Sequence, residues 1–214
     1  MARKKSINSI SGNCHLSQQT LDYLKLSKQP FGKEVLSSQT FYSDAGLEKI
    51  VNNIRHQAQF SDLLLLVEGP HGSGKTSLFR QLLQIDTPNI KLLPVQAEPT
   101  DTLAHLQQKA LLHLEDMGNS AQLEESLNNL QTFDQIALLV IDDAHVLSDN
   151  TLQALLAYQQ QLQQQGITLK ILFFANNGLA QTLQKVAEIA DEQIYLQNMP
   201  QYHAKLAGHF INFK

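Results

Sequence analysis

Short apolar runs alternate along the chain with longer stretches in which apolar residues recur every three or four positions. The runs are rich in Leu, Ile, Val and Phe, and they fall at residues 63–67, 90–95, 136–141, 169–175 and, more weakly, 193–196. Continuous apolar runs of this length are typical of strands buried on both faces of a parallel sheet. The helical spacing between them predicts helices on both faces, and therefore an α/β layered fold with right-handed crossovers.

The helical spacing predicts four stretches between the strands, at residues 75–85, 101–130, 149–165 and 178–188. Gly118 lies inside the second stretch and is expected to divide it into two helices. A further helix is predicted to begin at Ser43-Asp44, ahead of the first strand, because apolar residues follow there at helical spacing.

Composition and charge narrow the class of protein. A length of 214 residues suits one medium domain or one domain with an appendage. A net charge of -4 and a pI near 6.0 argue against a broad DNA-coating surface. Cys14 is the single cysteine of the chain, which excludes an internal disulfide and a cysteine-based zinc site. No apolar run approaches the roughly 20 residues of a membrane span, and the basic start lacks the apolar stretch of a secretory signal, so we expect a cytoplasmic protein.

Residues 69–76 read Gly-Pro-His-Gly-Ser-Gly-Lys-Thr, which matches in full the pattern G-x-x-x-x-G-K-[ST] of a phosphate-binding loop. The glycines allow a tight turn that points backbone N–H groups at a phosphate, and the helix N-terminus adds partial positive charge. Lys75 supplies a cation between the β- and γ-phosphates, and Thr76 offers a hydroxyl to Mg²⁺. His71 stands at a variable position and is expected to contribute its backbone. A glycine-rich turn without a ligand is the alternative.

These roles predict ATP or ADP with Mg²⁺ as the cofactors. The predicted nucleotide-binding residues are consecutive: Gly69, Pro70, His71, Gly72, Ser73, Gly74, Lys75, Thr76 and Ser77.

Two carboxylates, Asp142 and Asp143, follow the apolar run at 136–141. An apolar strand that ends in adjacent acids indicates a cation or a solvent-filled cleft at that point. We predict that Asp142 binds the Mg²⁺ together with Thr76, and that Asp143 orients or deprotonates the attacking water. The alternative for Asp143 is a residue that starts a helix or a turn. His145 either lines the same cleft or lies on the surface.

Asn176 and Asn177 follow the next apolar run. The carboxyl ends of parallel strands meet in the crevice where α/β proteins bind ligands, so an amide there can hydrogen-bond the γ-phosphate or the water. Ordinary turn formation is the alternative. The sequence does not decide between the two asparagines; with Asn176 as the choice, the predicted catalytic residues are Asp143, Lys75 and Asn176.

The strings GPHGSGKT, LLVIDDAH and LFFANN, in this order, resemble the Walker A, Walker B and sensor 1 motifs of the AAA+ class of P-loop ATPases. With the lead-in QPFGKEVLSSQTFYSDAGLEKIVNNI, the chain also resembles the ExeA/GspA-type ATPases of bacterial envelope and secretion machinery and the AAA-domain relatives of the division protein DamX. The resemblance covers about residues 28–200. It implies a five-stranded parallel sheet in the order 5-1-4-3-2, adenine beside the lead-in, and assembly into rings or filaments.

Composition and the same resemblance together set the expected domain limits, since residues 1 to about 20 are polar, rich in Ser and Asn, and lack a periodic apolar pattern. Residues 1–27 are expected to form a flexible N-terminal tail, with a leader added to the natural sequence as the alternative, and residues 28–200 the AAA+ nucleotide-binding domain. Residues 201–214 are expected to begin a lid helix or a C-terminal helix, so that the helical lid of the family is truncated or minimal.

The chain departs from the family at two points. The second Walker B acid is Asp143 where the family usually has Glu, and the shorter side chain lies farther from the water. The arginines are Arg3, Arg55 and Arg80, so nothing in the later half matches the arginine finger or the sensor 2 arginine. A finger contributes about 10³–10⁵-fold to the rate. Lys185 is the nearest late cation, but it lacks the planar fork of arginine.

We therefore expect slow ATP hydrolysis by a motor or switch of a bacterial envelope, secretion or cell-division complex, at the cytoplasmic face of the inner membrane or in the cytoplasm. Self-association or a partner protein would supply the arginine. One alternative is a nucleotide-gated protein-binding module with negligible hydrolysis. Another is a DNA-handling helper in transposition or helicase loading, which is supported in the sequence by the basic segment Arg3-Lys4-Lys5. We expect no salt-dependent DNA binding by residues 28–214.

Overall fold

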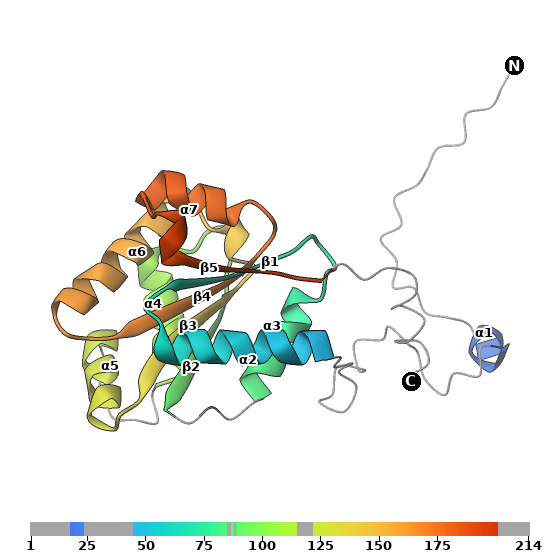
Figure 1. The fold of residues 1–214 in the computed structure, drawn as a ribbon, viewed down its shortest axis with the longest axis horizontal. Helices are drawn as coiled ribbons and strands as arrows, with labels where there is room; N and C mark the ends of the chain where they lie inside the picture. The colour runs from blue at the N-terminus through green and yellow to red at the C-terminus, as the bar shows by residue number, and fades with distance from the viewer. Residues whose placement is uncertain (1–17, 24–44, 85–86, 88, 115–121, 201–214) are drawn as a thin grey trace, which may run out of the picture. The chain divides into compact units, whose positions relative to one another are not determined.

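The computed structural model describes residues 18–23, 45–84, 87, 89–114 and 122–200 (Figure 1). The chain divides into two units, residues 1–42 with 208–214 and residues 43–207. The predicted lid segment at 201–214 lies outside the described residues.

In the first unit, helix α1 spans Gln18–Tyr23, inside the segment that the sequence predicts to be a flexible tail. Gln18 Nε2 donates to Asp22 Oδ1 at 3.1 Å, one helical turn further on. Side-chain pairs at this spacing favour a local helix, and an apolar pattern does not reveal them. The remainder of residues 1–27 is outside the described part of the chain.

The second unit contains a sheet of five parallel strands in the order β2-β3-β4-β1-β5. Read from the other edge, this is the order 5-1-4-3-2, so the predicted fold class is confirmed. Every predicted strand is present, with ends that differ by at most two residues. The strands are β1 (Leu64–Glu68), β2 (Ile90–Gln96), β3 (Ile136–Asp142), β4 (Leu169–Ala175) and β5 (Ile194–Asn198).

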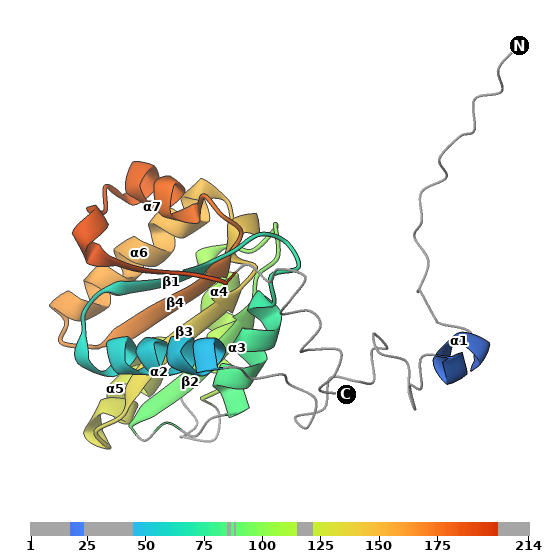
Figure 2. The same cartoon turned by 45° about the vertical axis from the view of Figure 1, so that its right-hand side comes forward.

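Helices cover both faces of this sheet, α2 and α3 on one side and α4 to α7 on the other (Figures 1 and 2). The stretch at 101–130 forms two helices as predicted, although Gly118 itself is outside the described residues. Short 3₁₀ helices, η4 (Ala144–Val146) and η5 (Asp191–Gln193), lie after β3 and before β5, and η5 includes Gln193, which the sequence predicts as the first residue of the last strand. The α-helices are α2 (Ala45–Phe60), α3 (Lys75–Gln84), α4 (Leu103–Leu111), α5 (Leu123–Thr132), α6 (Asp149–Gln164) and α7 (Leu179–Ala187).

The core is built on both sides of β4, in which all residues are buried. Phe173 belongs to the apolar cluster under α4 to α7. Phe174 points the other way and meets Phe79 of α3 edge-on, with ring centroids 5.8 Å apart. Pro94 lies in β2, which has β3 alone as its partner in the sheet, and an edge strand is where a proline is tolerated.

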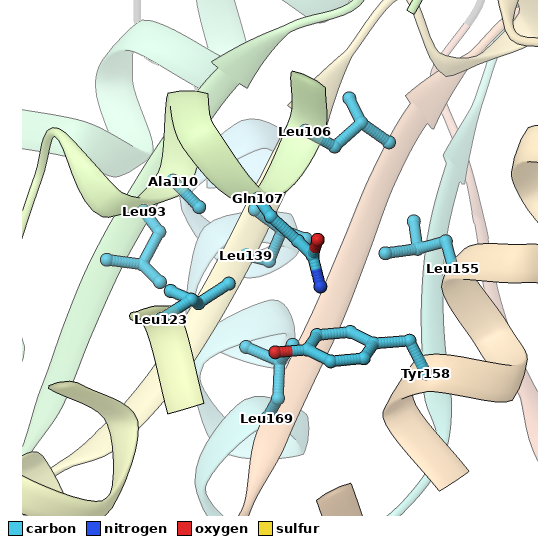
Figure 3. A pocket seen from close by; sticks show the side chains of 9 residues that line it. All are labelled: Leu93, Leu106, Gln107, Ala110, Leu123, Leu139, Leu155, Tyr158 and Leu169. Atoms are coloured by element: carbon cyan, nitrogen blue, oxygen red, sulfur yellow. The ribbon is translucent and has the colours of Figure 1, made fainter. Parts of the chain in front are cut away.

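A small cavity remains in this core, between α4, α5, α6 and the sheet (Figure 3). Its volume is about 10 Å³, enough for one water molecule and far too little for a nucleotide. Burial raises the pKa of Tyr158 on its wall, and the Gln107 side chain acts in the opposite direction. The lining residues are Leu93, Leu106, Gln107, Ala110, Leu123, Leu139, Leu155, Tyr158 and Leu169.

Glu68 joins the end of β1 to the start of α7. Its side chain is buried, with the residue only 4% exposed. Oε1 accepts from the backbone N–H of Ala180 at 2.8 Å, and Oε2 accepts from that of Gly178 at 3.3 Å. A carboxylate in this position satisfies the N–H groups that a helix start leaves open and complements the positive end of the helix dipole.

Glu68→Ala is expected to lower the free energy of unfolding by about 2 kcal/mol, because it leaves the buried N–H of Ala180 and the part-buried N–H of Gly178 without an acceptor. Urea unfolding followed by circular dichroism would measure the change. Glu192→Ala, which removes an exposed carboxylate from η5, is the control and should alter stability by less than about 0.5 kcal/mol. Equal losses in the two variants would contradict the capping role of Glu68.

Candidate functional site

The loop between β1 and α3 is a tight turn that leads directly into a helix N-terminus. Gly69 N–H donates to the Ala175 carbonyl at 3.2 Å, and Ser73 N–H donates to the Pro70 carbonyl at 3.1 Å. Gly72 and Gly74 have φ values of 79° and 91°, a region that L side chains rarely adopt. Helix α3 then begins at Lys75. The glycines of the motif are therefore required by the shape of this loop.

Met199 packs against the same loop from the end of β5. A Cβ placed on Gly69 would lie 2.7 Å from Met199 Cβ and 2.6 Å from Ser73 Oγ. The Met199 N–H donates to the Glu68 carbonyl at 2.7 Å, which holds the two segments together. Sequence reasoning missed Met199, since a single methionine after a weak strand carries no recognisable signal.

Lys75 extends back over the loop toward the end of β4. The residue is only 6% exposed, and Nζ donates to the carbonyls of Gly69 at 2.8 Å and Pro70 at 3.0 Å and to Asn176 Oδ1 at 3.0 Å. Burial lowers the pKa of Lys75, while the charges of Asp143 and Asp142 raise it. The loop thus holds the Lys75 ammonium among oxygen atoms, at the position where a bound phosphate would contact it.

Asp142 ends β3 and is fully buried. Oδ1 accepts the Asp143 N–H at 3.0 Å, whereas Oδ2 has no hydrogen-bond partner within the described part of the chain. Burial is the largest cause of a raised Asp142 pKa, and the charge of Asp143 adds to it, while a hydrogen bond from the Thr76 side chain, the Asp143 backbone and the charge of Lys75 lower it.

An open, desolvated carboxylate oxygen near a hydroxyl fits a Mg²⁺ ion, which takes few protein ligands and completes its shell with water and phosphate oxygens. The described residues contain no group of three His, Cys, Asp or Glu side chains that could hold a metal by themselves.

Asp143 turns the chain sharply out of β3. Its φ of 55° lies in the left-handed region, which Asp tolerates better than most residues. The side chain makes no capping hydrogen bond to η4; instead, Oδ2 accepts from Gln96 Nε2 at 2.9 Å. Gln96 pairs in register with Asp142 at the end of β2, one residue beyond the predicted apolar run. The sequence signal that could have identified Gln96 is its position as a polar residue at the carboxyl end of a parallel strand.

Of the two asparagines after β4, Asn176 is the one that meets Lys75. Its Nδ2 lies 2.7 Å from His145 Nε2, whereas Asn177 is exposed. His71 is also exposed, and Ser77 is half-buried on α3. The structure therefore brings together Lys75, Asp142, Asp143 and Asn176 at the carboxyl ends of β1, β3 and β4, while their catalytic and metal-binding roles remain predictions.

The profile of a family described as "AAA domain" matches residues 56–183, more than half of the chain. The chain belongs to this AAA domain family. The matched segment contains the whole loop at 69–76, both Walker B acids and Asn176, but it ends before Met199. AAA+ ATPases generally bind ATP or ADP with Mg²⁺, in agreement with the open carboxylate of Asp142. No curated protein matches the chain.

Solved structures share the fold of this AAA domain at low sequence identity. Cdc6p from Pyrobaculum aerophilum is 15% identical with a TM-score of 0.61, over 85% of this chain and 52% of that one. The Orc1 protein of Aeropyrum pernix, solved in complex with DNA, is 18% identical with a TM-score of 0.56, over 84% and 51%. A Walker-type ATPase of Pyrococcus abyssi is 16% identical with a TM-score of 0.51, over 82% and 58%. The AAA domain thus spans little more than half the length of these chains.

Proposed function

We propose that this AAA domain binds Mg·ATP and hydrolyses it slowly, as the motor or switch of a bacterial envelope, secretion or cell-division complex. The observation that carries the proposal is the placement of Lys75 Nζ. It lies among the carbonyls of the loop and Asn176 Oδ1, at the carboxyl ends of the strands, where β3 ends in Asp142 with an Oδ2 that is unpaired among the described residues.

Each residue of the site has a distinct part in this proposal. The N–H groups of the loop and Lys75 bind the phosphates, and Lys75 exchanges its bonds to protein oxygens for bonds to phosphate oxygens. Thr76 and Asp142 would hold Mg²⁺, which neutralises developing charge when it is bound. Asp143 orients the attacking water and accepts its proton, and Asn176 donates to the γ-phosphate or the water.

Two features support slow turnover. The described residues after Arg80 contain no arginine, so the domain itself brings no late guanidinium to the γ-phosphate. In addition, Asp143 Oδ2 is engaged by Gln96 Nε2, which competes with a water molecule for the same oxygen. The second feature also favours a nucleotide-gated binding module as the second candidate function.

The purified chain is expected to bind Mg·ATP in calorimetry and to turn over at less than about 1 per second at saturating nucleotide, below the typical enzyme rate. Phosphate release measures the turnover. A Lys75→Ala preparation purified in the same way accounts for contaminating activity. Faster turnover would contradict the proposed slow hydrolysis, and the absence of any binding would contradict the assignment of the site.

The envelope setting is supported by the resemblance of the motifs and lead-in to ExeA/GspA-type and DamX-related ATPases. Residues 29–44 of that lead-in are outside the described residues. Among the helices that the structure describes, none is long and apolar enough to cross a membrane. The DNA-handling alternative draws on the similarity to an Orc1 solved with DNA, but an overall charge of -4 does not favour it. DNA binding that depends steeply on salt concentration would favour the DNA-handling alternative over the envelope setting.

A further inference from the structure

A chain of three side chains crosses the candidate site and ends on a residue that the proposed mechanism does not use. Lys75 Nζ lies 3.0 Å from Asn176 Oδ1, and Asn176 Nδ2 lies 2.7 Å from His145 Nε2. The three residues come from α3, from the turn after β4 and from η4. His145 is exposed, so nothing about its burial accounts for its placement.

The donors and acceptors of these three side chains allow only one orientation of the Asn176 amide. A lysine ammonium can only donate, so the amide oxygen of Asn176 must face Lys75 and the amide NH₂ must face His145. Since the NH₂ donates, His145 Nε2 must be the acceptor. This geometry assigns the ring proton of His145 to Nδ1.

The local backbone holds His145 in this place. The left-handed turn at Asp143 leads into η4, where the Val146 N–H donates to the Asp143 carbonyl at 3.0 Å. Ala144 is fully buried and anchors the turn in the core, which leaves the next side chain directed across the ends of the strands toward Asn176.

From this geometry we propose that His145 is a positioning residue that fixes the orientation of the Asn176 amide. By accepting from Nδ2, it keeps Oδ1 toward Lys75 and keeps an N–H donor on the side of the Walker B strand. When Lys75 exchanges its bond to Oδ1 for bonds to phosphate oxygens, it no longer orients the amide, and without the His145 acceptor the amide can rotate and turn its NH₂ away from this position. The inference rests on the proposed ATP hydrolysis for its kinetic consequence, but not for its geometry.

A substitution series at His145 separates positioning from simple packing. Gln can present an oxygen where Nε2 stands, Leu removes the acceptor, and Lys replaces it with a donor. We expect His145→Leu to lower kcat for ATP hydrolysis about three- to tenfold with little change in KM, since a single hydrogen bond is lost. His145→Lys should lower kcat at least as much, whereas His145→Gln should retain most of the wild-type kcat.

His113→Leu is the matched control, because it removes another exposed histidine from the turn after α4 and should leave kcat unchanged. Equal rates for the Leu and Gln variants of His145, whether both low or both unchanged, would overturn the positioning role, because the acceptor would then be irrelevant.

The tautomer of His145 gives a second readout that does not depend on hydrolysis. Long-range ¹H–¹⁵N spectra at mildly alkaline pH should show the His145 proton on Nδ1, with the resonance assigned by its loss in His145→Gln. Asn176→Ala should shift the proton toward Nε2. A wild-type proton on Nε2, or no response to Asn176→Ala, would overturn the inference even if the domain hydrolyses ATP. A wild type that shows the Nδ1 tautomer but binds no ATP would overturn the proposed function and leave the His145–Asn176 contact established.

Discussion

Asp143→Asn is expected to lower kcat for ATP hydrolysis by about 10²–10⁴-fold while the Kd for Mg·ATP changes little. The amide has nearly the shape of the carboxylate and can still accept from Gln96 Nε2, which lies 2.9 Å from Asp143 Oδ2, so the turn and the loop should persist. What the variant loses is the negative charge that accepts the proton of the attacking water. Phosphate release at saturating nucleotide and calorimetry on the same preparation would measure the two quantities.

The chain offers a closely matched control for this variant. Asp134 is exposed just ahead of β3, and its φ of 56° equals within a degree that of Asp143 at the far end of the strand. Asp134→Asn therefore makes the same chemical change on the same backbone conformation, away from the site, and should leave kcat unaltered. Wild-type hydrolysis by Asp143→Asn would mean that this carboxylate is not the base.

Lys75→Ala is expected to weaken Mg·ATP binding by about 10- to 150-fold, the range for removal of a charge-assisted hydrogen bond. The variant also leaves the carbonyls of Gly69 and Pro70 as the oxygens that face an incoming phosphate, and these repel it. Calorimetric titration would measure the loss, and thermal unfolding without nucleotide would show that the fold is retained.

Lys185→Ala serves as the control, because it removes an exposed lysine from the last turn of α7. Unchanged affinity in Lys75→Ala would contradict the phosphate-binding role of the loop. The two active-site variants together also separate the candidate functions. If Lys75→Ala abolishes partner binding while Asp143→Asn preserves it, nucleotide occupancy is the signal and hydrolysis is incidental.

The sequence predicts the sheet well because β1, β3 and β4 are buried on both faces and so appear as uninterrupted apolar runs. The loop at 69–76 is equally predictable from the sequence, since its backbone conformation requires glycine at positions 72 and 74. By contrast, β5 is an edge strand with half-exposed positions, and its pattern is correspondingly weak.

Contacts between strands that are distant in the chain could not be predicted. Gln96 meets Asp143 because β2 and β3 pair in one particular register, and no local pattern specifies that register. His145 looks like an ordinary residue after a strand until the end of β4 brings Asn176 to it. Helix α1 escaped prediction for the opposite reason, since its support is a local polar pair with no apolar face to reveal it.

Strand β1, which leads into the phosphate loop, is separated from both of its pairing partners by the longest stretches of sequence in the sheet. Leu65 of β1 pairs with Leu172 of β4 and Tyr195 of β5, so both flanking strands leave the ribosome only after about a hundred more residues have been translated. Throughout that interval the nascent chain carries an apolar segment with both hydrogen-bonding edges open, which is the kind of surface that chaperones bind. The loop that follows this strand therefore gains its two flanking neighbours only when the last strands have been made.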